Sequence, residues 1–556
     1  MSSDIEIARQ FTAKPIQEIA DKLNIDPEYI LPYGKDIAKV HFSAMEAARK
    51  KRKPGKLILV SATTPTAAGE GKTTTSIGLA QAFTQLNESV CLALREPSLG
   101  PCLGMKGGAC GGGYAQIMPM DRINLHFTGD FHAITSANNL ISAAIDNHIF
   151  HGNALRIDQR QIVWRRCMDM NDRSLRNIVV GLGGKMQGFP REGGFDITAA
   201  SEIMAILCLS EDAEDLEKRI NRILVAYTAD GSPVYAEALE ITGAIMALLR
   251  DAIHPNLVQT FEGTPALIHG GPFANIAHGC NSVIATKMAM QLADYTITEA
   301  GFGFDLGAEK FFDIKCRIAK LDPDAVVLVT TIRALKSHGG VDKADLERPD
   351  PDAVYRGLEN LDKHIESVQQ FSKQPIVAIN EFIADTEAEI DIVLQHCKHK
   401  NVHVARSKHY TEGGKGAVDL AKLVIEFIDE GQPFKPLYEL EIPVVEKIRN
   451  VALAMYGASS VSFTKEAERD LKLIESLGLS DLPICIAKAP SSLSDDPTLR
   501  GRPRDFEVTV RGLQVNRGAG FLVVLTGNIM RMPGLPKVPE AMKYKLEKDG
   551  SISGMS

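Results

Sequence analysis

The sequence predicts an α/β fold, with a mostly parallel sheet in its first and largest part. Two apolar runs, Lys56–Ala62 and Val90–Leu94, are typical of buried strands. Between them, a Gly/Thr-rich turn leads into a helical segment that carries Leu79 and Phe83 on one face. A strand, a helix and a strand in this order form a right-handed βαβ unit, whose two strands lie parallel in one sheet.

The same alternation continues along the chain. Helix-length segments at 201–209 and 419–428 separate further apolar runs, which lie at 177–182, 325–330, 375–379 and 484–488. Near the end, the runs 506–515 and 520–525 flank an Asn-Arg-Gly turn at 516–518, which predicts an antiparallel hairpin. The last part of the chain is therefore expected to hold a mixed sheet.

A chain of 556 residues is long enough for three or four domains. Two charged or Pro-rich stretches, 341–353 and 431–436, are typical of surface connections. We expect a large P-loop nucleotide-binding domain over residues 1–360 and two smaller α/β domains. These are 361–460, which would contribute folate-binding aromatic residues, and 461–556, with the mixed sheet.

Composition excludes several classes of protein. The net charge of −8 gives no reason to expect a nucleic-acid partner, and no run approaches the roughly 20 apolar residues that cross a membrane. The start of the chain lacks a leader pattern, so we expect a cytoplasmic protein. The nine cysteines form no Cys-x-x-Cys pair and the histidines no His-Glu-x-x-His motif, so a protein-caged transition metal is not expected.

The strongest local signal is the loop 64–75, which reads Thr-Pro-Thr-Ala-Ala-Gly-Glu-Gly-Lys-Thr-Thr-Thr and lies between the first strand and helix. Gly69 and Gly71 allow the backbone to fold around a phosphate, Lys72 adds a positive charge, and Thr73 can ligate Mg²⁺. The common P-loop pattern has glycine where this chain has Thr66. The motif predicts ATP or GTP binding by a variant P-loop, against the alternative of a chance Gly-Lys-Thr in a turn.

Arg95 directly follows the second strand, at the edge of the sheet where open parallel sheets bind ligands. Together with Lys72 it would stabilise charge on a transferring phosphoryl group or a carboxylate. A structural salt bridge is the alternative for Arg95. The seven glycines within 100–113 indicate either a backbone cradle for an anion or a flexible loop.

Three later loops, 126–132, 194–198 and 298–307, combine Gly with Asp and Phe. Carboxylates there would hold Mg²⁺ or a monovalent cation, and Phe would stack on a flat ring; ordinary turn chemistry is the alternative. His269 and His278 flank a Gly-Gly-Pro turn at a spacing that suits no standard metal site. We expect a packed loop at the border of the active site there.

Taken together, these segments resemble the formate–tetrahydrofolate ligase family. The resemblance covers roughly residues 5–540 and includes blocks that ordinary signalling ATPases lack. The blocks lie at 64–75, 95–113, 114–120, 123–133, 169–173, 194–206, 264–281, 298–317, 333–340, 492–497 and 518–537.

The resemblance implies a three-domain α/β subunit of a homotetramer that uses Mg²⁺-ATP and is activated by a monovalent cation, K⁺ or NH₄⁺. In this family, formate attacks the γ-phosphorus of ATP to give formyl phosphate. The N10 amine of tetrahydrofolate then attacks the formyl carbon, which gives 10-formyltetrahydrofolate and phosphate. The expected role is therefore in one-carbon metabolism.

The resemblance also assigns residues. Lys72 is expected beside the transferring phosphoryl group, Arg95 as the anchor of formyl phosphate, and Thr73 as the Mg²⁺ ligand through ATP. The folate and cation region is expected to contain Glu96, Asp130, Phe302, Phe382 and Tyr410, the last two as a stacking clamp. The ATP loop is expected to comprise Pro65, Thr66, Ala67, Ala68, Gly69, Glu70, Gly71, Lys72, Thr73 and Thr74.

The sequence departs from the family pattern in three places. Tyr410 stands where Trp is usual, which leaves a smaller stacking surface. Phe304 stands where a small residue is usual and is expected to narrow the pocket, and Ala-Pro-Ser at 489–491 replaces a stretch that often reads Thr-Gln-Tyr. The P-loop contains none of these departures, so ATP use is unaffected by them.

Two other functions remain open on the sequence alone. In a P-loop regulatory or partitioning ATPase, Lys72 and Thr73 would drive nucleotide-dependent dimerisation without formate. An ATP-dependent ligase acting on another small carboxylate would use the same loop. Substrate-dependent release of ADP distinguishes these alternatives.

Overall fold

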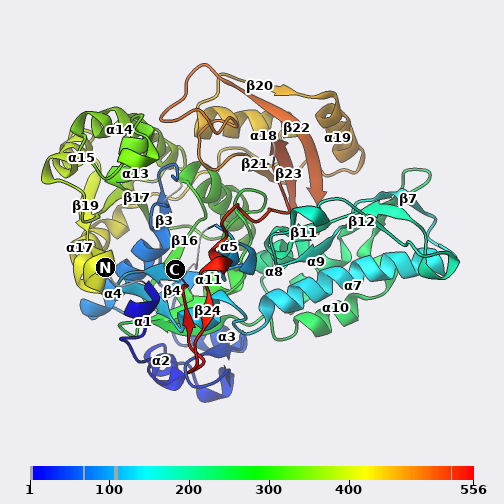
Figure 1. Ribbon diagram of the computed structural model, residues 1–556, viewed down its shortest axis with the longest axis horizontal. Coiled ribbons are helices and arrows are strands. Elements are labelled where there is room, and N and C mark those ends of the chain that lie inside the picture. Colours follow the sequence, from blue (N-terminus) through cyan, green and yellow to red (C-terminus); the bar gives the residue numbers. More distant parts are fainter. Residues whose placement is uncertain (1–3, 67–68, 106–109, 528, 556) are drawn as a thin grey trace.

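The computed structural model describes residues 4–66, 69–105, 110–527 and 529–555 (Figure 1). Its centre is a sheet in which seven neighbouring strands run parallel. In sheet order they are β15 (Pro265–Ile268), β4 (Val90–Leu94), β16 (Tyr295–Glu299), β3 (Lys56–Ala62), β17 (Ala325–Thr330), β18 (Pro375–Asn380) and β19 (His403–Ser407). The mostly parallel sheet predicted from the sequence is confirmed.

Antiparallel strands complete one edge of this sheet. Beside β15 lies β14 (Asn256–Thr260), followed by β2 (Ala38–Val40) and β1 (Ile30–Pro32). The short strand β6 (Ala115–Met118) also pairs with β14 and with β5 (Gly111–Gly112). This edge is therefore mixed, whereas the rest of the sheet is parallel.

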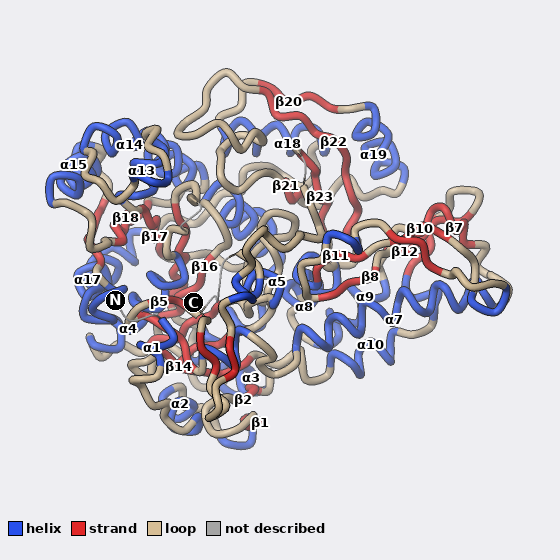
Figure 2. Tube along the Cα trace, viewed as in Figure 1, coloured by secondary structure: helices blue, strands red, loops and turns tan. Residues whose placement is uncertain are grey.

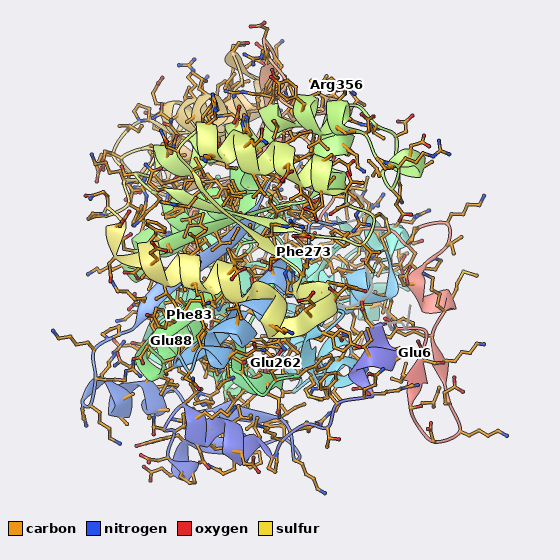
Figure 3. All side chains as sticks on the ribbon, turned by 90° about the vertical axis from the view of Figure 1, so that its left-hand side faces the viewer. Glu6, Phe83, Glu88, Glu262, Phe273 and Arg356 are labelled. Carbon is orange, nitrogen blue, oxygen red and sulfur yellow. The ribbon has the colours of Figure 1, made fainter. Side chains whose placement is uncertain are left out.

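Helices cover both faces of the sheet, which explains why its strands are apolar throughout. On one face, Ile58 and Val60 of β3 share a core with α4 (Lys72–Gln85) and α17 (Val418–Phe427). On the other face, Leu57 and Leu59 share a core with α11 (Val283–Leu292), α13 (Ile332–His338) and α14 (Pro351–Gln370). Figure 3 views the molecule from the side of α17 and α15 (Glu387–His399), with Phe83 of α4 labelled.

The segment 361–460, expected to be an α/β domain of its own, shares the central sheet. Its strands β18 and β19 continue directly from β17, and the expected join near residue 360 falls inside α14. The segment therefore forms no separate sheet, because its strands pair with those of the preceding part of the chain. The division of the chain into three domains stays a prediction.

An elongated part projects from the central sheet at the right of Figure 1. Its longest helix is α7 (Asp130–Phe150), which packs with α8 (Glu202–Leu209) and α10 (Thr242–Leu249). Beside it lie β7 (Ile157–Ile162), β12 (Leu224–Thr228) and β13 (Pro233–Tyr235). The run 177–182 contains a strand, β9 (Ile178–Val180), but it pairs only with β10 (Arg191–Gly193) in a surface hairpin.

A second, four-stranded sheet occupies the C-terminal part and appears as a separate red layer in Figure 2. Its order is β20 (Ser460–Phe463), β22 (Glu507–Asn516), β23 (Phe521–Thr526) and β21 (Ile484–Ala487). The antiparallel pair β22–β23 places Asn516 opposite Phe521. The predicted hairpin and mixed sheet are both confirmed.

Across the described ranges, no helix combines the length and apolarity that a membrane crossing requires.

Candidate functional site

The loop 64–75, predicted to be a P-loop, joins the carboxyl end of β3 to the first turn of α4. Gly69 and Gly71 have φ values of +77° and +73°, in the left-handed region that glycine adopts without strain. A Cβ atom on Gly71 would also lie 2.4 Å from Nδ2 of Asn380, the last residue of β18. Only glycine fits there. The loop residues Ala67 and Ala68 lie outside the described residues.

Glu70 stabilises the loop 64–75 through hydrogen bonds on its buried side. Its carboxylate is buried and accepts hydrogen bonds from the Thr66 backbone N–H at 2.7 Å and the Thr331 hydroxyl at 2.8 Å. Asn380 Nδ2 donates to the Glu70 carbonyl oxygen at 3.2 Å. The structure therefore gives Glu70 a supporting role in the loop, and its expected contact with ATP stays a prediction.

Thr64, at the start of the loop, is tied to the helices behind it. His364 Nε2 lies 2.9 Å from the Thr64 hydroxyl oxygen, and Asn360 Nδ2 donates to the same oxygen at 3.0 Å. His338 Nε2 lies 2.9 Å from the Thr64 carbonyl oxygen. Burial lowers the pKa of His364 to about 3, so this ring is neutral. The start of the loop is thus held by hydrogen bonds to buried polar side chains of α13 and α14.

Thr73 and Arg95 both contact Glu299, which lies in the 298–307 loop whose carboxylates were expected to hold a cation. The Thr73 hydroxyl donates to Glu299 Oε2 at 2.7 Å, and Arg95 Nη2 lies 3.4 Å from Glu299 Oε1. Arg95 thus forms the structural ion pair considered as its alternative. Glu299 is the last residue of β16, so an acid at the end of a buried strand was the signal that pointed to it. Lys72 is half-buried as the first residue of α4, and Thr74 follows Thr73 in its first turn.

Glu96 and Asp130 lie in a buried charged cluster. Asp130 Oδ1 accepts from Lys39 Nζ at 2.7 Å, and Oδ2 accepts from Asn256 Nδ2 at 2.8 Å. Burial, and next the charge of Asp130, raise the pKa of Glu96 well above its usual range, while Lys39 opposes this. Glu96 Oε2 is buried without a hydrogen-bond partner among the described residues.

Phe382 and Tyr410 form an aromatic pair. Their ring centroids are 6.4 Å apart and the planes are tilted by 37°. Phe382 follows β18 and Tyr410 follows β19, so both lie at the carboxyl edge of the sheet that holds the P-loop. The guanidinium carbon of Arg333 lies 3.6 Å from the Phe382 ring centroid, which is cation–π contact. Asp385 Oδ2 fixes the loop by accepting the Phe382 N–H at 2.8 Å.

Tyr410 is fixed by the N-terminal part of the chain. Its hydroxyl donates to Asp4 Oδ1 at 3.1 Å, and its carbonyl accepts the Tyr114 N–H at 2.9 Å. Burial and the neighbouring Asp4 raise the pKa of Tyr410 to about 12. A Cβ atom on Gly113 would lie 2.0 Å from the Tyr410 carbonyl oxygen. One of the seven clustered glycines therefore allows this close approach.

The rest of the glycine-rich stretch is more regular than expected. Residues 99–103, which include Gly100, form the short helix α5, and Gly111 and Gly112 form β5. A Cβ atom on Gly100 would meet Asn171 Oδ1 at 2.4 Å, so close packing against that side chain requires glycine. Residues 106–109 lie outside the described residues, and the anion cradle stays a prediction.

Phe302 has a φ of +58°, which is strained for a bulky side chain. It stands between Gly301, whose added Cβ would lie 2.8 Å from Arg95 Nη1, and Gly303. The loop of Phe302 therefore packs directly against Arg95. Phe304 was expected to narrow the pocket, but its fully buried ring packs in the core near Phe371, with centroids 6.0 Å apart.

The histidines of the 269–278 loop are packed, as expected. His269 Nδ1 lies 2.7 Å from the Ser282 hydroxyl, and its Nε2 lies 2.6 Å from the Ala252 carbonyl oxygen. Burial lowers the pKa of His269 to about 4 and that of His278 well below its usual range. The described residues contain no group of three or more His, Cys, Asp or Glu side chains arranged to hold a metal ion.

A cavity of about 340 Å³ lies away from these residues. It lies between the projecting part and the C-terminal sheet, and its lining includes Trp164, Glu202, Asn516 and Arg531. None of the expected site residues lines it. We therefore place the candidate site at the carboxyl edge of the central sheet. The loop 64–75, Arg95 and the aromatic pair all lie there.

This edge carries the loop 64–75, Arg95 and the Phe382–Tyr410 pair, to which the resemblance assigns substrate binding. A family model described as formate–tetrahydrofolate ligase matches residues 2–556, essentially the whole chain. The chain is therefore a ligase that belongs to the formate–tetrahydrofolate ligase family.

Proposed function

We propose that this chain joins formate to tetrahydrofolate with ATP, through formyl phosphate, in one-carbon metabolism. The observation that carries the proposal is the contact of Thr73 and Arg95 with one carboxylate, that of Glu299. It brings the expected Mg²⁺ ligand and the expected phosphoryl anchor to one point. Phe382 and Tyr410 supply the stacking surface on the same edge of the sheet.

The ATP subsite would comprise residues 65–74. The left-handed turns at Gly69 and Gly71 would let the loop backbone curve around an anion, and the N-terminus of α4 would add positive potential. Lys72 would contact the transferring phosphoryl group. The Thr73 hydroxyl would hold Mg²⁺, which neutralises charge on the phosphates when it is bound.

Phosphorylation makes formate a competent acyl donor. A free carboxylate would have to expel an oxide, so a formate oxygen first attacks the γ-phosphorus and ADP leaves. The N10 lone pair of tetrahydrofolate then attacks the formyl carbon, the C–O bond to phosphate breaks, and the N10 proton leaves with the phosphate. Arg95 would stabilise the negative oxygens in both steps, because a fixed cation needs no reorganisation as charge develops.

The folate ring would bind between Phe382 and Tyr410. A flat ring stacked between two others needs centroids about 7 Å apart, twice a carbon–carbon contact distance. The observed separation is 6.4 Å with a 37° tilt, so a small movement of one ring would admit it. Phe302, in the loop against Arg95, would contact the reacting end of the folate.

A monovalent cation, K⁺ or NH₄⁺, would bind near Glu96 and Asp130. The unpartnered buried oxygen Glu96 Oε2 supports this assignment, because alkali cations bind oxygen ligands.

We also propose a cytoplasmic homotetramer. The side chains of Val179, Leu182 and Met186 are 54%, 65% and 79% exposed on one hairpin, which favours a subunit contact there.

The test is release of ADP from Mg²⁺-ATP with and without formate and tetrahydrofolate. The product 10-formyltetrahydrofolate is followed by its acid conversion to the methenyl form. We expect product only when all three substrates are present. Release of ADP that ignores formate and folate, with no formylated product, would instead indicate a regulatory ATPase.

A further inference from the structure

We infer that Glu299 is a positioning residue that orients the Thr73 hydroxyl and the Arg95 guanidinium together, a role that rests on the proposed function. Its carboxylate accepts a hydrogen bond from each of the two side chains. Glu299 itself is 4% exposed. It acts through its two neighbours, one toward the metal and the other toward the phosphoryl group.

The sheet topology explains the placement. Strand β16 lies between β3 and β4 and runs parallel to both, and Glu299 is its last residue. Strand β3 leads into the P-loop, whereas β4 leads into Arg95. The side chain that leaves the end of the middle strand therefore reaches both neighbours.

The direction of the Thr73 hydrogen bond matters for metal binding. The hydroxyl proton points to Glu299 Oε2 at 2.7 Å, so the lone pairs of the oxygen are directed elsewhere. A hydroxyl ligates a cation through a lone pair. The carboxylate thus fixes the rotamer and the proton position that a Mg²⁺ ligand needs, as partners of metal ligands commonly do.

Arg95 is held by weaker and more adjustable contacts. Nη2 lies 3.4 Å from Glu299 Oε1, and Nη1 lies 3.5 Å from the Pro272 carbonyl oxygen. Glycine at 301 leaves room for the guanidinium, because a Cβ atom there would lie 2.8 Å from Nη1. The side chain is therefore aimed by Glu299 while its long contact leaves it able to shift toward a ligand anion.

The structural alternative is that Glu299 only neutralises Arg95 in a poorly hydrated site. The two roles differ in what they predict for metal affinity. A purely stabilising residue would change the melting temperature, whereas a positioning residue also changes how tightly metal binds to the nucleotide complex.

The decisive experiment measures Mn²⁺ binding to the full-length protein with ATP, from the free Mn²⁺ signal in electron paramagnetic resonance. In Glu299→Gln we expect affinity about 10-fold to 100-fold weaker, the range for loss of a group that orients a metal ligand. ATP binding without metal should be unchanged. Asp324→Asn is the matched control, because it removes an ion-paired carboxylate beside Lys56 at the opposite edge of the sheet.

A double-mutant cycle separates orientation from general damage. In a Thr73→Ala background, which removes the hydroxyl, Glu299→Gln should weaken Mn²⁺ binding no further. Additive effects, or wild-type Mn²⁺ affinity in Glu299→Gln, would overturn the inference. If Glu299→Gln does not fold, Glu299→Asp serves instead: it keeps the charge but shortens the reach, so its Mn²⁺ affinity should also fall, and wild-type affinity would refute the role.

Failure of the proposed function gives a different pattern. In that case the wild-type protein would make no formylated product, while the coupling between Thr73 and Glu299 in Mn²⁺ binding would still be measurable. With the function intact, Glu299→Gln should also raise the KM for formate, because Arg95 loses its anchor. If the wild type makes the formylated product but Thr73 and Glu299 show no coupling in Mn²⁺ binding, the positioning role is refuted and the proposed function stands.

Discussion

Lys488 and Asp305 form an ion pair with 2.8 Å between Nζ and Oδ2, and both side chains are fully buried. Lys488 follows β21 of the C-terminal sheet, whereas Asp305 belongs to the short π-helix η6 (Phe304–Ala308), which begins two residues after Phe302. Lys488 Nζ also lies 4.9 Å from the Tyr456 ring centroid and donates to the Ala489 carbonyl at 3.1 Å. The pair therefore fixes the C-terminal sheet against a loop of the candidate site.

Removing one partner of this pair should destabilise the protein strongly. In Lys488→Met the Asp305 carboxylate would remain buried without its cation, which costs about 3–5 kcal/mol. Urea unfolding measures the change. The surface variant Arg348→Ala breaks an exposed pair with Asp345 and should leave the unfolding midpoint unchanged. Equal midpoints for Lys488→Met and the wild type would show that this pair does not stabilise the fold.

Lys72→Ala and Arg95→Ala should each fold but transfer formyl groups poorly. Removing one preorganised charge stabiliser lowers kcat by about 10²-fold to 10³-fold in comparable sites. Rates are measured at saturating ATP, formate and folate, with circular dichroism as the check on folding. Arg250→Ala, which removes an exposed arginine, is the control and should keep the full rate. Near-normal turnover in either site variant would remove that residue from the mechanism.

Tyr410→Ala should chiefly weaken folate binding. Loss of one stacking partner is worth about 0.5–1.5 kcal/mol, so the KM for folate should rise about threefold to tenfold while that for ATP stays constant. Tyr410→Phe keeps the ring and loses only the hydroxyl bond to Asp4. Its folate dependence should match the wild type. An unchanged folate KM in Tyr410→Ala would argue against the stacking clamp.

Local pattern was enough to predict the elements that define the fold. The alternation of apolar runs located β3, β4, β17 and β18, and the turn at 516–518 located the hairpin β22–β23, because each depends on neighbouring residues. The left-handed conformations of Gly69 and Gly71 could also be predicted, because they depend only on the residue type at those two positions.

Contacts between segments far apart in the chain could not be predicted from the sequence. Nothing local indicates that β16 inserts between β3 and β4, so Glu299 was not connected with Thr73, 226 positions away. The bond from Tyr410 to Asp4 spans 406 positions. Phe304 shows the same limit: it stands where the family usually has a small residue, which suggested a narrower pocket, whereas tertiary packing places its ring in the core.

Glu202 should make the free energy of unfolding fall as pH rises from about 4 to about 7. Its Oε1 accepts the N–H groups of Gly518 at 2.8 Å and Ala519 at 3.2 Å, yet burial raises the pKa of Glu202 to about 7. The ordinary value is about 4.3. Between these two values the folded state keeps a proton that the unfolded state has released. The stabilisation present below pH 4 is therefore lost as pH rises to about 7.

Glu202→Gln tests this directly, because the amide oxygen can accept the same two N–H groups without becoming charged. We expect the variant to match the wild type below about pH 4 and to be more stable by about 3 kcal/mol at pH 8. Urea unfolding at pH 5, 6, 7 and 8 gives the comparison, with Glu214→Gln as an exposed control whose difference from wild type should show no rise across this range. A constant difference between Glu202→Gln and the wild type from pH 5 to 8 would mean that Glu202 does not titrate in the folded protein, since only a shifted pKa makes the two curves diverge.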